Sequence, residues 1–278
     1  MNHILSPEDF VVEEVIDPKF LRKFERGAEK VVYVKGPYTL YLLKKRNLTT
    51  EEALKIIAAK FKIPVASVGF AGLKDKFAVT SQYISIKGSF DGFAEKNISL
   101  EGVGKTNKHI SIGNLIANKF SITLHNCDAG KIEKSFHSTK KMPNFFGPQR
   151  FGSKKNNHEI GKLIVDKKFA EALNMINASG GRYASLKHVE KRKLKFYINA
   201  YQSEIFNKKL EITTKTGKIK IPGFNVDELM LSCSGFEREA YVVPKNMACE
   251  KYGFAVKLAF TLPKGSYATV LINELLKD

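Results

Sequence analysis

The alternation of strand-type and helix-type segments is the feature that most limits how this 278-residue chain can fold. Residues 10–16 and 31–43 are rich in β-branched and aromatic side chains, which predicts two strands. Thr49 and Glu52 then fit a capping box, and an apolar stripe at helical spacing continues until Pro64. Strands followed closely by a helix indicate a chain that combines sheet and helix in one unit.

After residue 64 the predicted secondary structure is first strands, then mostly helices, and finally short strands, a strand and a helix. The patterns predict strands at 83–87 and 120–124, helices at 131–142, 158–178 and 188–211, short strands and turns over 214–238, a strand at 252–261 and a closing helix at 268–276. No segment of roughly 20–50 residues repeats, which excludes a solenoid. The sequence therefore predicts an α+β fold in which a largely helical insertion interrupts a sheet domain.

Composition and cysteine usage narrow the class of protein. Hydrophobic residues make up 43% of the chain, so it can bury a core and is not a disordered basic tail. No apolar run approaches the roughly 18 residues of a membrane span, and residues 1–10 lack the apolar region of a signal peptide. Cys127, Cys233 and Cys249 lie far apart, which argues against a zinc site or a disulfide framework. A cytoplasmic protein is expected.

The net charge predicts a polyanionic partner. Lys and Arg number 46 and Asp and Glu 28, which gives a formal charge of +18. The basic residues stand in small groups between apolar residues, such as 44–46 and 191–193, which indicates basic surfaces on a folded body. Binding to nucleic acid would then weaken steeply with salt. A lysine-rich genome is the alternative explanation.

A glycine-containing segment, residues 69–82, holds the main candidate for catalysis. Gly69 and Gly72 imply a tight backbone just before Lys74 and Asp75. An aspartate held where a loop enters a strand is suited to act as a nucleophile or base. Because neighbours in an extended chain point to opposite faces, a cation that keeps Asp75 ionised is expected from elsewhere in the chain. An ordinary β-turn with a solvated Lys-Asp-Lys run explains the same pattern.

A second dense segment, residues 144–152, contains three phenylalanines, two glycines, Gln149 and Arg150. Aromatic rings stack on bases, glutamine reads a base edge, and arginine holds phosphate, so the composition suits RNA binding. A hydrophobic turn packed on the core explains the same composition equally well.

Other chemistries have little support in the sequence. It contains no P-loop motif, no GxGxxG cradle for a dinucleotide and no GxSxG nucleophile elbow. The six histidines are scattered and do not pair at the spacing of metal ligands.

Six segments spread over nearly the whole chain form one series. They are residues 7–13, 69–82, 113–120, 144–152, 199–207 and 262–269. Taken in this order, they resemble the TruD family of tRNA pseudouridine synthases. The combination is highly specific, although the Pro-Glu-Asp-Phe of the first segment alone is weak.

This resemblance implies a pseudouridine-synthase core, in which helices flank a mixed and mainly antiparallel sheet, and a mostly helical insertion domain of the TruD type. The expected catalytic domain comprises residues 1–154 and 243–278. The expected insertion domain comprises residues 155–242.

The resemblance also carries functional residues to this chain. Asp75 matches the family's catalytic aspartate in an Ala-Gly-x-Lys-Asp motif. Asn118 and Phe120 match an Asn-x-Phe motif near the flipped base, and Tyr267 matches an aromatic residue expected to pack against that base. The other residues expected to bind substrate are Lys74, Gln82, Phe146, Gln149 and Arg150.

The implied reaction converts one uridine of tRNA, expected at position 13 in the D arm, into pseudouridine after the base flips into a basic cleft. The uracil is detached, rotated and rejoined, so no cofactor and no metal are expected. The expected partner is tRNA, and a monomer without a protein partner is expected. The alternatives are a non-catalytic RNA-binding or RNA-chaperone protein and another RNA-modifying enzyme such as a methyltransferase.

Three positions depart from the family pattern. The family often has a lysine three residues before the Pro-Glu-Asp-Phe segment, as a partner for the catalytic carboxylate, and Ile4 stands there in this chain. Ala117 replaces a glycine, and residues 105–109 replace an arginine-rich stretch. Ile4 leaves open which cation lies beside Asp75.

Overall fold

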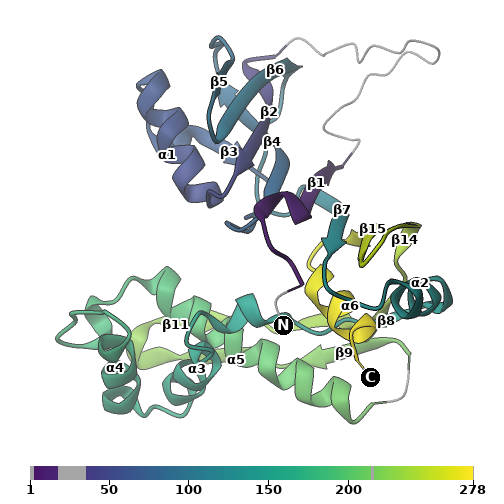
Figure 1. Cartoon of the computed structure of the whole chain (residues 1–278). Coiled ribbons are helices and arrows are strands. Elements are labelled where there is room, and N and C mark those ends of the chain that lie inside the picture. Colours follow the sequence, from purple (N-terminus) through teal and green to yellow (C-terminus); the bar gives the residue numbers. More distant parts are fainter. Residues whose placement is uncertain (1–2, 18–35, 214–215, 278) are drawn as a thin grey trace. The chain divides into compact units, whose positions relative to one another are not determined.

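The computed structural model describes residues 3–17, 36–213 and 216–277 (Figure 1). The chain divides into two compact units, of which unit 1 comprises Met1–Thr139 and Pro244–Gly265 and unit 2 comprises Lys140–Val243 and Ser266–Asp278. Unit 2 includes the whole predicted insertion, residues 155–242, and the predicted domain boundaries stay a proposal. Among the described residues, none of the helices combines the length and apolar character needed to span a bilayer.

Unit 1 is built on a nine-stranded sheet. Its strands are β1 (Phe10–Ile16), β2 (Tyr38–Arg46), β3 (Val68–Phe70), β4 (Val79–Lys87), β5 (Phe93–Glu95), β6 (Ile98–Thr106), β7 (Leu115–Leu124), β14 (Lys245–Tyr252) and β15 (Ala255–Pro263). They follow the order β14-β15-β7-β1-β4-β2-β6-β5, with β3 paired to β4. Of the strand pairs described, β1 with β4 is parallel and the others are antiparallel. The predicted mixed, mainly antiparallel sheet is therefore confirmed.

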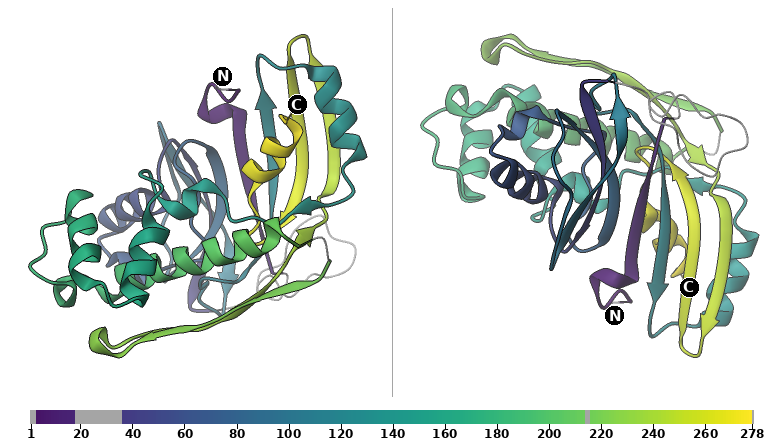
Figure 2. Two further views of the ribbon diagram at one scale, coloured as in Figure 1. Left: turned by 90° about the horizontal axis from the view of Figure 1, so that it is seen from below. Right: turned by 90° about the horizontal axis from the view of Figure 1, so that it is seen from above.

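Two helices lie on this sheet. Helix α1 (Thr50–Phe61) buries Ala53, Leu54 and Ile57 in a cluster with side chains of β2, β4 and β6. Its capping box is present as predicted, because the Thr49 side chain accepts from Glu52 N while the Glu52 carboxylate accepts from Thr49 N. Helix α2 (Ala129–Ser138) lies along β14 and β15 (Figure 2).

Some predicted boundaries in unit 1 are wrong. The helix predicted at 131–142 ends at Ser138, because Met142–Pro143 pair as strand β8 with β13 (Tyr241–Val242). The strand predicted at 252–261 is β15 preceded by a turn, since Gly253 adopts a positive φ of 59° that ends β14. The first five residues of the strand predicted at 31–43 lie outside the described residues.

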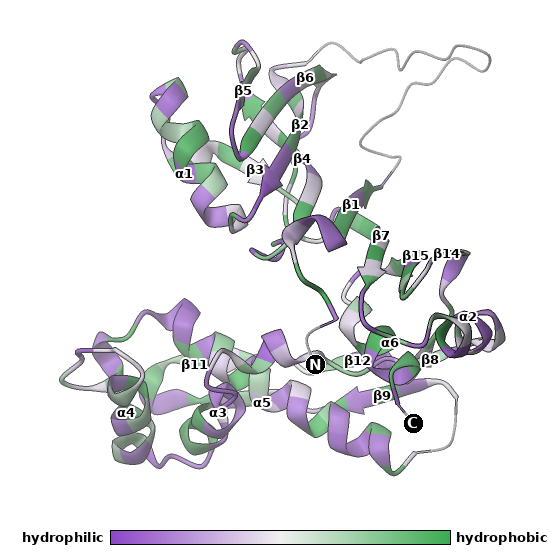
Figure 3. Cartoon of the chain, in the orientation of Figure 1, coloured by the Kyte–Doolittle hydropathy of each residue, from purple (hydrophilic) through white to green (hydrophobic). Residues whose placement is uncertain are grey.

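Unit 2 combines helices with two-stranded ladders. Its helices are α3 (Asn157–Val165), α4 (Phe169–Ala178), α5 (Lys191–Glu211) and α6 (Ala268–Leu275). Its ladders pair β9 (Lys218–Ile221) with β12 (Phe236–Glu239), β10 (Phe224–Val226) with β11 (Leu231–Cys233), and β8 with β13. In Figure 3, hydrophobic and hydrophilic residues alternate along α3, α4 and α5, as helices with one buried stripe require.

The helix predicted at 158–178 is two helices. Lys167 adopts a positive φ of 60°, which an α-helix cannot contain, so the chain turns between α3 and α4. The apolar pattern continues across the turn because both helices bury Ile164, Ala172 and Ile176 in the same cluster. Helix α3 then packs closely on α5 at Gly161, where a Cβ atom would lie 2.0 Å from Tyr197 O.

We expect Thr49→Ala to destabilise unit 1 by about 1 kcal/mol, because the first turn of α1 loses its side-chain acceptor. The free energy of unfolding from urea titration measures this loss, and faster exchange of the first amide protons of α1 locates it. The matched control is Ser89→Ala, at an exposed position after β4. Equal stability of the two variants would contradict the capping role.

Candidate active site

Asp75 lies in the loop of residues 71–78, which connects β3 to β4. The side chains of this loop divide between the interior and solvent. Lys74 and Ala78 are buried, whereas Leu73, Asp75, Lys76 and Phe77 are exposed. Asp75 thus keeps an exposed surface while its neighbour Lys74 turns inward, as expected for adjacent residues of an extended chain.

A chain of buried hydrogen bonds fixes the course of this loop. Thr50, the first residue of α1, accepts from Lys74 N at 2.9 Å and donates its hydroxyl to Gln82 Oε1 at 3.1 Å. Gln82, on β4, donates from Nε2 to Gly72 O at 3.2 Å. Thr50 and Gln82 are almost fully buried, so each of these groups would lose free energy without its partner. The loop is thereby tied to both α1 and β4.

Lys74 forms a buried ion pair with Glu14. Its Nζ atom lies 2.8 Å from Glu14 Oε1, and 5% of the Lys74 side chain and none of the Glu14 side chain is exposed. Glu14, on β1, also accepts from Tyr83 N at 3.1 Å. Removing one partner of such a buried pair typically costs roughly 3–5 kcal/mol. Lys74 and Gln82, both expected to bind substrate, thus have their polar groups engaged beneath the loop.

Lys45 supplies a cation beside Asp75 that the sequence patterns did not single out. It lies on β2, is 2% exposed, and donates from Nζ to Asp75 O at 2.9 Å and to Leu48 O at 2.5 Å. Burial lowers the pKa of the Lys45 ammonium to about 8, although attraction to Asp75 opposes this shift. The sequence analysis left the cation beside Asp75 open, and Lys45 of β2 is a positive charge that acts on the Asp75 carboxyl group.

Asp75 itself keeps an exposed surface while protein atoms crowd its carboxyl group. This partial desolvation raises the pKa of Asp75, and the positive charges of Lys45 and then Lys74 oppose the rise. A carboxylate that is accessible, fixed and only partly hydrated is suited to react with a substrate rather than only to be solvated.

Asn118 and Phe120 lie on β7, next to β1. Asn118 is directly opposite Glu14, so the two side chains share one face of the sheet. The Asn118 Oδ1 atom is buried and has no hydrogen-bond partner among the described residues. It is therefore an acceptor that a substrate donor can satisfy.

Phe120 is part of the core. Its ring is 8% exposed and lies between Phe10, at a centroid distance of 6.2 Å, and Phe260, at 5.4 Å. The ring thus supports the strand that carries Asn118.

The remaining predicted residues belong to unit 2. Arg150, in the short helix Pro148–Phe151, donates from Nε to Ser203 Oγ at 3.0 Å. Its guanidinium lies 5.7 Å from the centre of the Phe146 ring, and Tyr267 packs edge-on to that ring at 6.3 Å. Gln149 is exposed. The structure thus brings Phe146, Arg150 and Tyr267 together around one aromatic ring.

Gly147 is required for this arrangement. A Cβ atom at this position would lie 2.6 Å from the ring of Tyr267, which is closer than real contacts allow. The absence of a side chain lets the backbone approach Tyr267.

Arg238, on β12, is a second basic residue at this ring that the sequence patterns missed. Its guanidinium lies 4.1 Å from the centre of the Phe146 ring and donates to Asn144 O at 3.0 Å and to Asn144 Oδ1 at 2.7 Å. Burial lowers the pKa of Arg238 to about 10, with Tyr267 opposing the shift. The alternation of β12 turns this residue inward, but a short strand with two glutamates gave no local signal of its partners.

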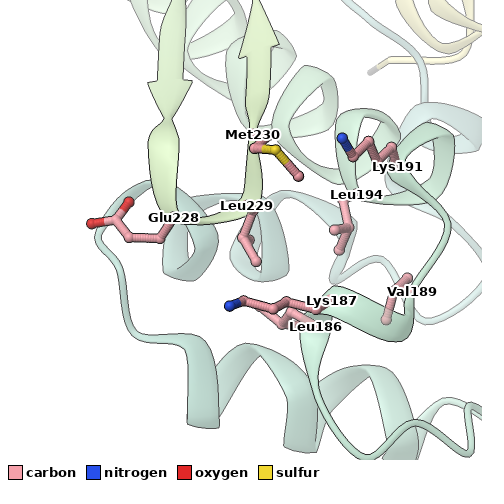
Figure 4. Close-up of a pocket in the computed structure, with 8 residues that line it drawn as sticks. All are labelled: Leu186, Lys187, Val189, Lys191, Leu194, Glu228, Leu229 and Met230. Carbon is pink, nitrogen blue, oxygen red and sulfur yellow. The ribbon is translucent and has the colours of Figure 1, made fainter.

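A cavity of about 300 Å³ lies elsewhere in unit 2 (Figure 4). Its lining comes from Leu186, Lys187, Val189, Lys191, Leu194, Glu228, Leu229 and Met230. None of the predicted site residues lines it, and its one carboxylate, Glu228, is paired with Lys167. Among the described residues, no group of three or more His, Cys, Asp or Glu side chains is placed to hold a metal ion. The Asp75 loop therefore remains the candidate centre for chemistry.

Several known proteins are similar to this chain. A tRNA pseudouridine synthase D of Aquifex aeolicus is 30% identical over 256 residues, which cover 87% of this chain and 60% of that protein. A relative from Nanoarchaeum equitans, whose name places it in the same family, is 32% identical over 280 residues and covers 98% of this chain and 68% of its own length. A relative from Methanocaldococcus jannaschii is 36% identical over 178 residues, but the chain spans only 39% of its length.

A solved structure from Methanosarcina mazei, described as a tRNA pseudouridine synthase D, shares the fold. The TM-score is 0.67 at 21% identity, and the match covers 98% of this chain and 92% of that one. The family model described as tRNA pseudouridine synthase D (TruD) matches residues 5–182 and 211–275. Because that match includes most of the sequence, the chain belongs to the TruD family.

Proposed function

We propose that this protein converts a uridine of tRNA into pseudouridine, and that the target is the uridine at position 13 in the D arm. The observation that carries the proposal is the placement of Asp75. It keeps an exposed surface on a loop tied to a buried polar network, its carbonyl accepts from the buried Lys45 ammonium, and the charge of Lys45 acts on its carboxyl group. Membership of the TruD family and the net charge of +18 support the same substrate class.

The reaction is an isomerisation. The bond between ribose C1′ and uracil N1 breaks, a bond between C1′ and C5 forms, the C5 proton is lost and N1 gains a proton. Atoms and electrons therefore balance without an external oxidant, reductant or donor group. Asp75 starts the reaction, either by forming a covalent adduct or by removing the ribose 2′ proton, and both routes need its ionised form.

The other candidate residues either contact the RNA or hold the strands and loop that carry Asp75. Asn118 offers its unsatisfied oxygen to the nucleotide. Phe146, Gln149, Arg150 and Tyr267 form the RNA-contacting set of unit 2. The supports are Lys74, Gln82 and Phe120, which hold the strands and the loop around Asp75.

Three features remain predictions from the sequence: a cytoplasmic location, a monomeric state, and residues 155–242 as the family's insertion domain. The substrate, in contrast, is testable directly with purified protein and unmodified tRNA.

We expect Asp75→Asn to lower the rate of pseudouridine formation by roughly 10²–10⁴-fold or more, because the amide is neither a base nor a nucleophile. Pseudouridine mapping on unmodified tRNA measures the rate, and filter binding measures tRNA affinity, which should stay near that of the wild type. Asp91→Asn, at an exposed position of the same unit, is the matched control. Normal turnover by Asp75→Asn would refute the assignment. Absent turnover by the wild type, with tight binding retained, would favour the non-catalytic RNA-binding alternative.

Lys45→Met is expected to shift the acid limb of the pH–rate profile to higher pH. Activity needs ionised Asp75 and is lost as pH falls through the Asp75 pKa, which Lys45 lowers. Removing the cation therefore raises that pKa further, whereas Lys45→Arg keeps the positive charge and the position of the limb.

Single-turnover rates measured from about pH 4, near the ordinary aspartate pKa, up to about pH 8 locate the limb, because the pKa of Asp75 is raised from that ordinary value. Below about pH 8 Lys45 of the wild type is protonated. Lys44→Met is the control, since Lys44 is exposed on the opposite face of β2. An acid limb that stays in place in Lys45→Met would show that Lys45 does not act on the Asp75 charge.

A further inference from the structure

Two large apolar side chains flank Asp75 and face solvent. Leu73 is 59% exposed and Phe77 is 51% exposed. Each is two residues from Asp75, so its Cα atom lies within about 7 Å of the Asp75 Cα atom. Isolated exposed apolar residues are common, but a pair on both sides of a reactive carboxylate forms a patch with a fixed relation to the chemistry.

The backbone holds this pair outward. Ala78 N donates to Lys76 O at 2.9 Å, which closes a tight turn around Phe77, and Ala78 O accepts from Asn47 N at 3.1 Å. On the other side, Gly72 O is bound by Gln82, and Lys74 N by Thr50. Since residues 72, 74 and 78 are tied to the interior, Leu73 and Phe77 cannot fold onto the core without breaking these bonds.

A nucleic-acid partner has apolar groups that match this patch. A uridine whose ribose or base reaches Asp75 has left its stack, and the faces of the neighbouring bases are then uncovered. Apolar side chains that enter such a gap, phenylalanine and leucine among them, cover those faces and keep the extruded base from returning. The positive net charge of the protein attracts a polyanion to its surface.

We propose that Leu73 and Phe77 contact the bases next to the target uridine and occupy the space that it leaves. This inference rests on the proposed function, because it takes Asp75 as the residue that meets the extruded nucleotide. It assigns to the loop a second task, which is to stabilise the extruded state that the carboxylate acts on.

The first test compares Phe77→Ala with Phe254→Ala. Phe254 is 85% exposed in the turn between β14 and β15 of the same unit, so the control removes an equally large exposed ring. Phe77→Ala should lower single-turnover kcat/KM on tRNA by roughly ten- to a hundredfold, as expected for a lost contact with one base. Phe77→Trp should restore most of the rate. Rates within twofold of the wild type for both alanine variants would overturn the proposal.

The second test uses an RNA in which the target uridine is already unpaired and unstacked. Extrusion then costs little, so the defect of Phe77→Ala should shrink to roughly threefold or less. An equal defect on both substrates would overturn the proposal, because Phe77 would then act in some way other than stabilising the extruded state.

The third test does not need turnover. 2-Aminopurine, a purine whose fluorescence is quenched by stacking, replaces the base next to the target in tRNA. Binding of the Asp75→Asn protein should raise the fluorescence of 2-aminopurine as the target leaves the stack. The double variant Asp75→Asn/Phe77→Ala should lose most of this rise, whereas the double variant Asp75→Asn/Phe254→Ala should keep it. If no variant and not even the wild type forms pseudouridine, the proposed function fails, yet this signal still decides for or against the contact of Phe77 with the RNA.

Discussion

The polar side chains buried beneath residues 71–78 are the constraint on which the candidate site depends. Thr50, Lys74 and Gln82 have donors or acceptors that water cannot reach, and each costs roughly 1–3 kcal/mol if it is left without a partner. Their partners come from α1, β1 and β4, so these elements can pack together only when the loop follows one course. The position of Asp75 follows from that satisfaction, together with the hydrogen bond that its own carbonyl accepts from Lys45 Nζ.

The same network separates the loop into two sides with different tasks. The inner side is polar and fully paired, which makes it rigid. The outer side carries Asp75 and Lys76 between the apolar residues Leu73 and Phe77. In a flexible segment these two apolar side chains would gain free energy by folding onto the nearest core, so the tied backbone is what keeps them exposed. Lys45 connects the two sides, since its ammonium holds the Asp75 carbonyl while its charge acts on the Asp75 carboxylate. Lys45 thus contributes both a hydrogen bond to the loop backbone and a charge at Asp75.

In unit 2 the predicted site residues are positioned by contacts with one aromatic ring, that of Phe146, whereas in unit 1 buried polar groups position them. Arg150 and Arg238 both lie against Phe146, and Tyr267 meets its edge. Burial lowers the pKa of both guanidinium groups, those of Arg150 and of Arg238. Arginine side chains nevertheless stay protonated at physiological pH. In the segment of residues 144–152, Phe146 packs in a cluster with Phe206 and lies against two arginines, which agrees with the packed turn that was one of the two explanations, while RNA binding by this segment stays a proposal.

The sequence by itself determined the elements whose signals are local: the capped helix α1, the strands β1 and β4, the α+β class, and the motif that contains Asp75. It misplaced the break between α3 and α4, because one apolar stripe runs through both helices and the turn at Lys167 has no glycine or proline to mark it. Only the tertiary structure decided that Lys45 faces Asp75, that Lys74 and Gln82 turn inward, and that Arg238 meets Phe146. Those pairings join residues between 10 and 92 positions apart in the chain (Gln82 with Gly72, and Arg238 with Phe146). Sheet register and helix packing, which no local pattern encodes, bring them together.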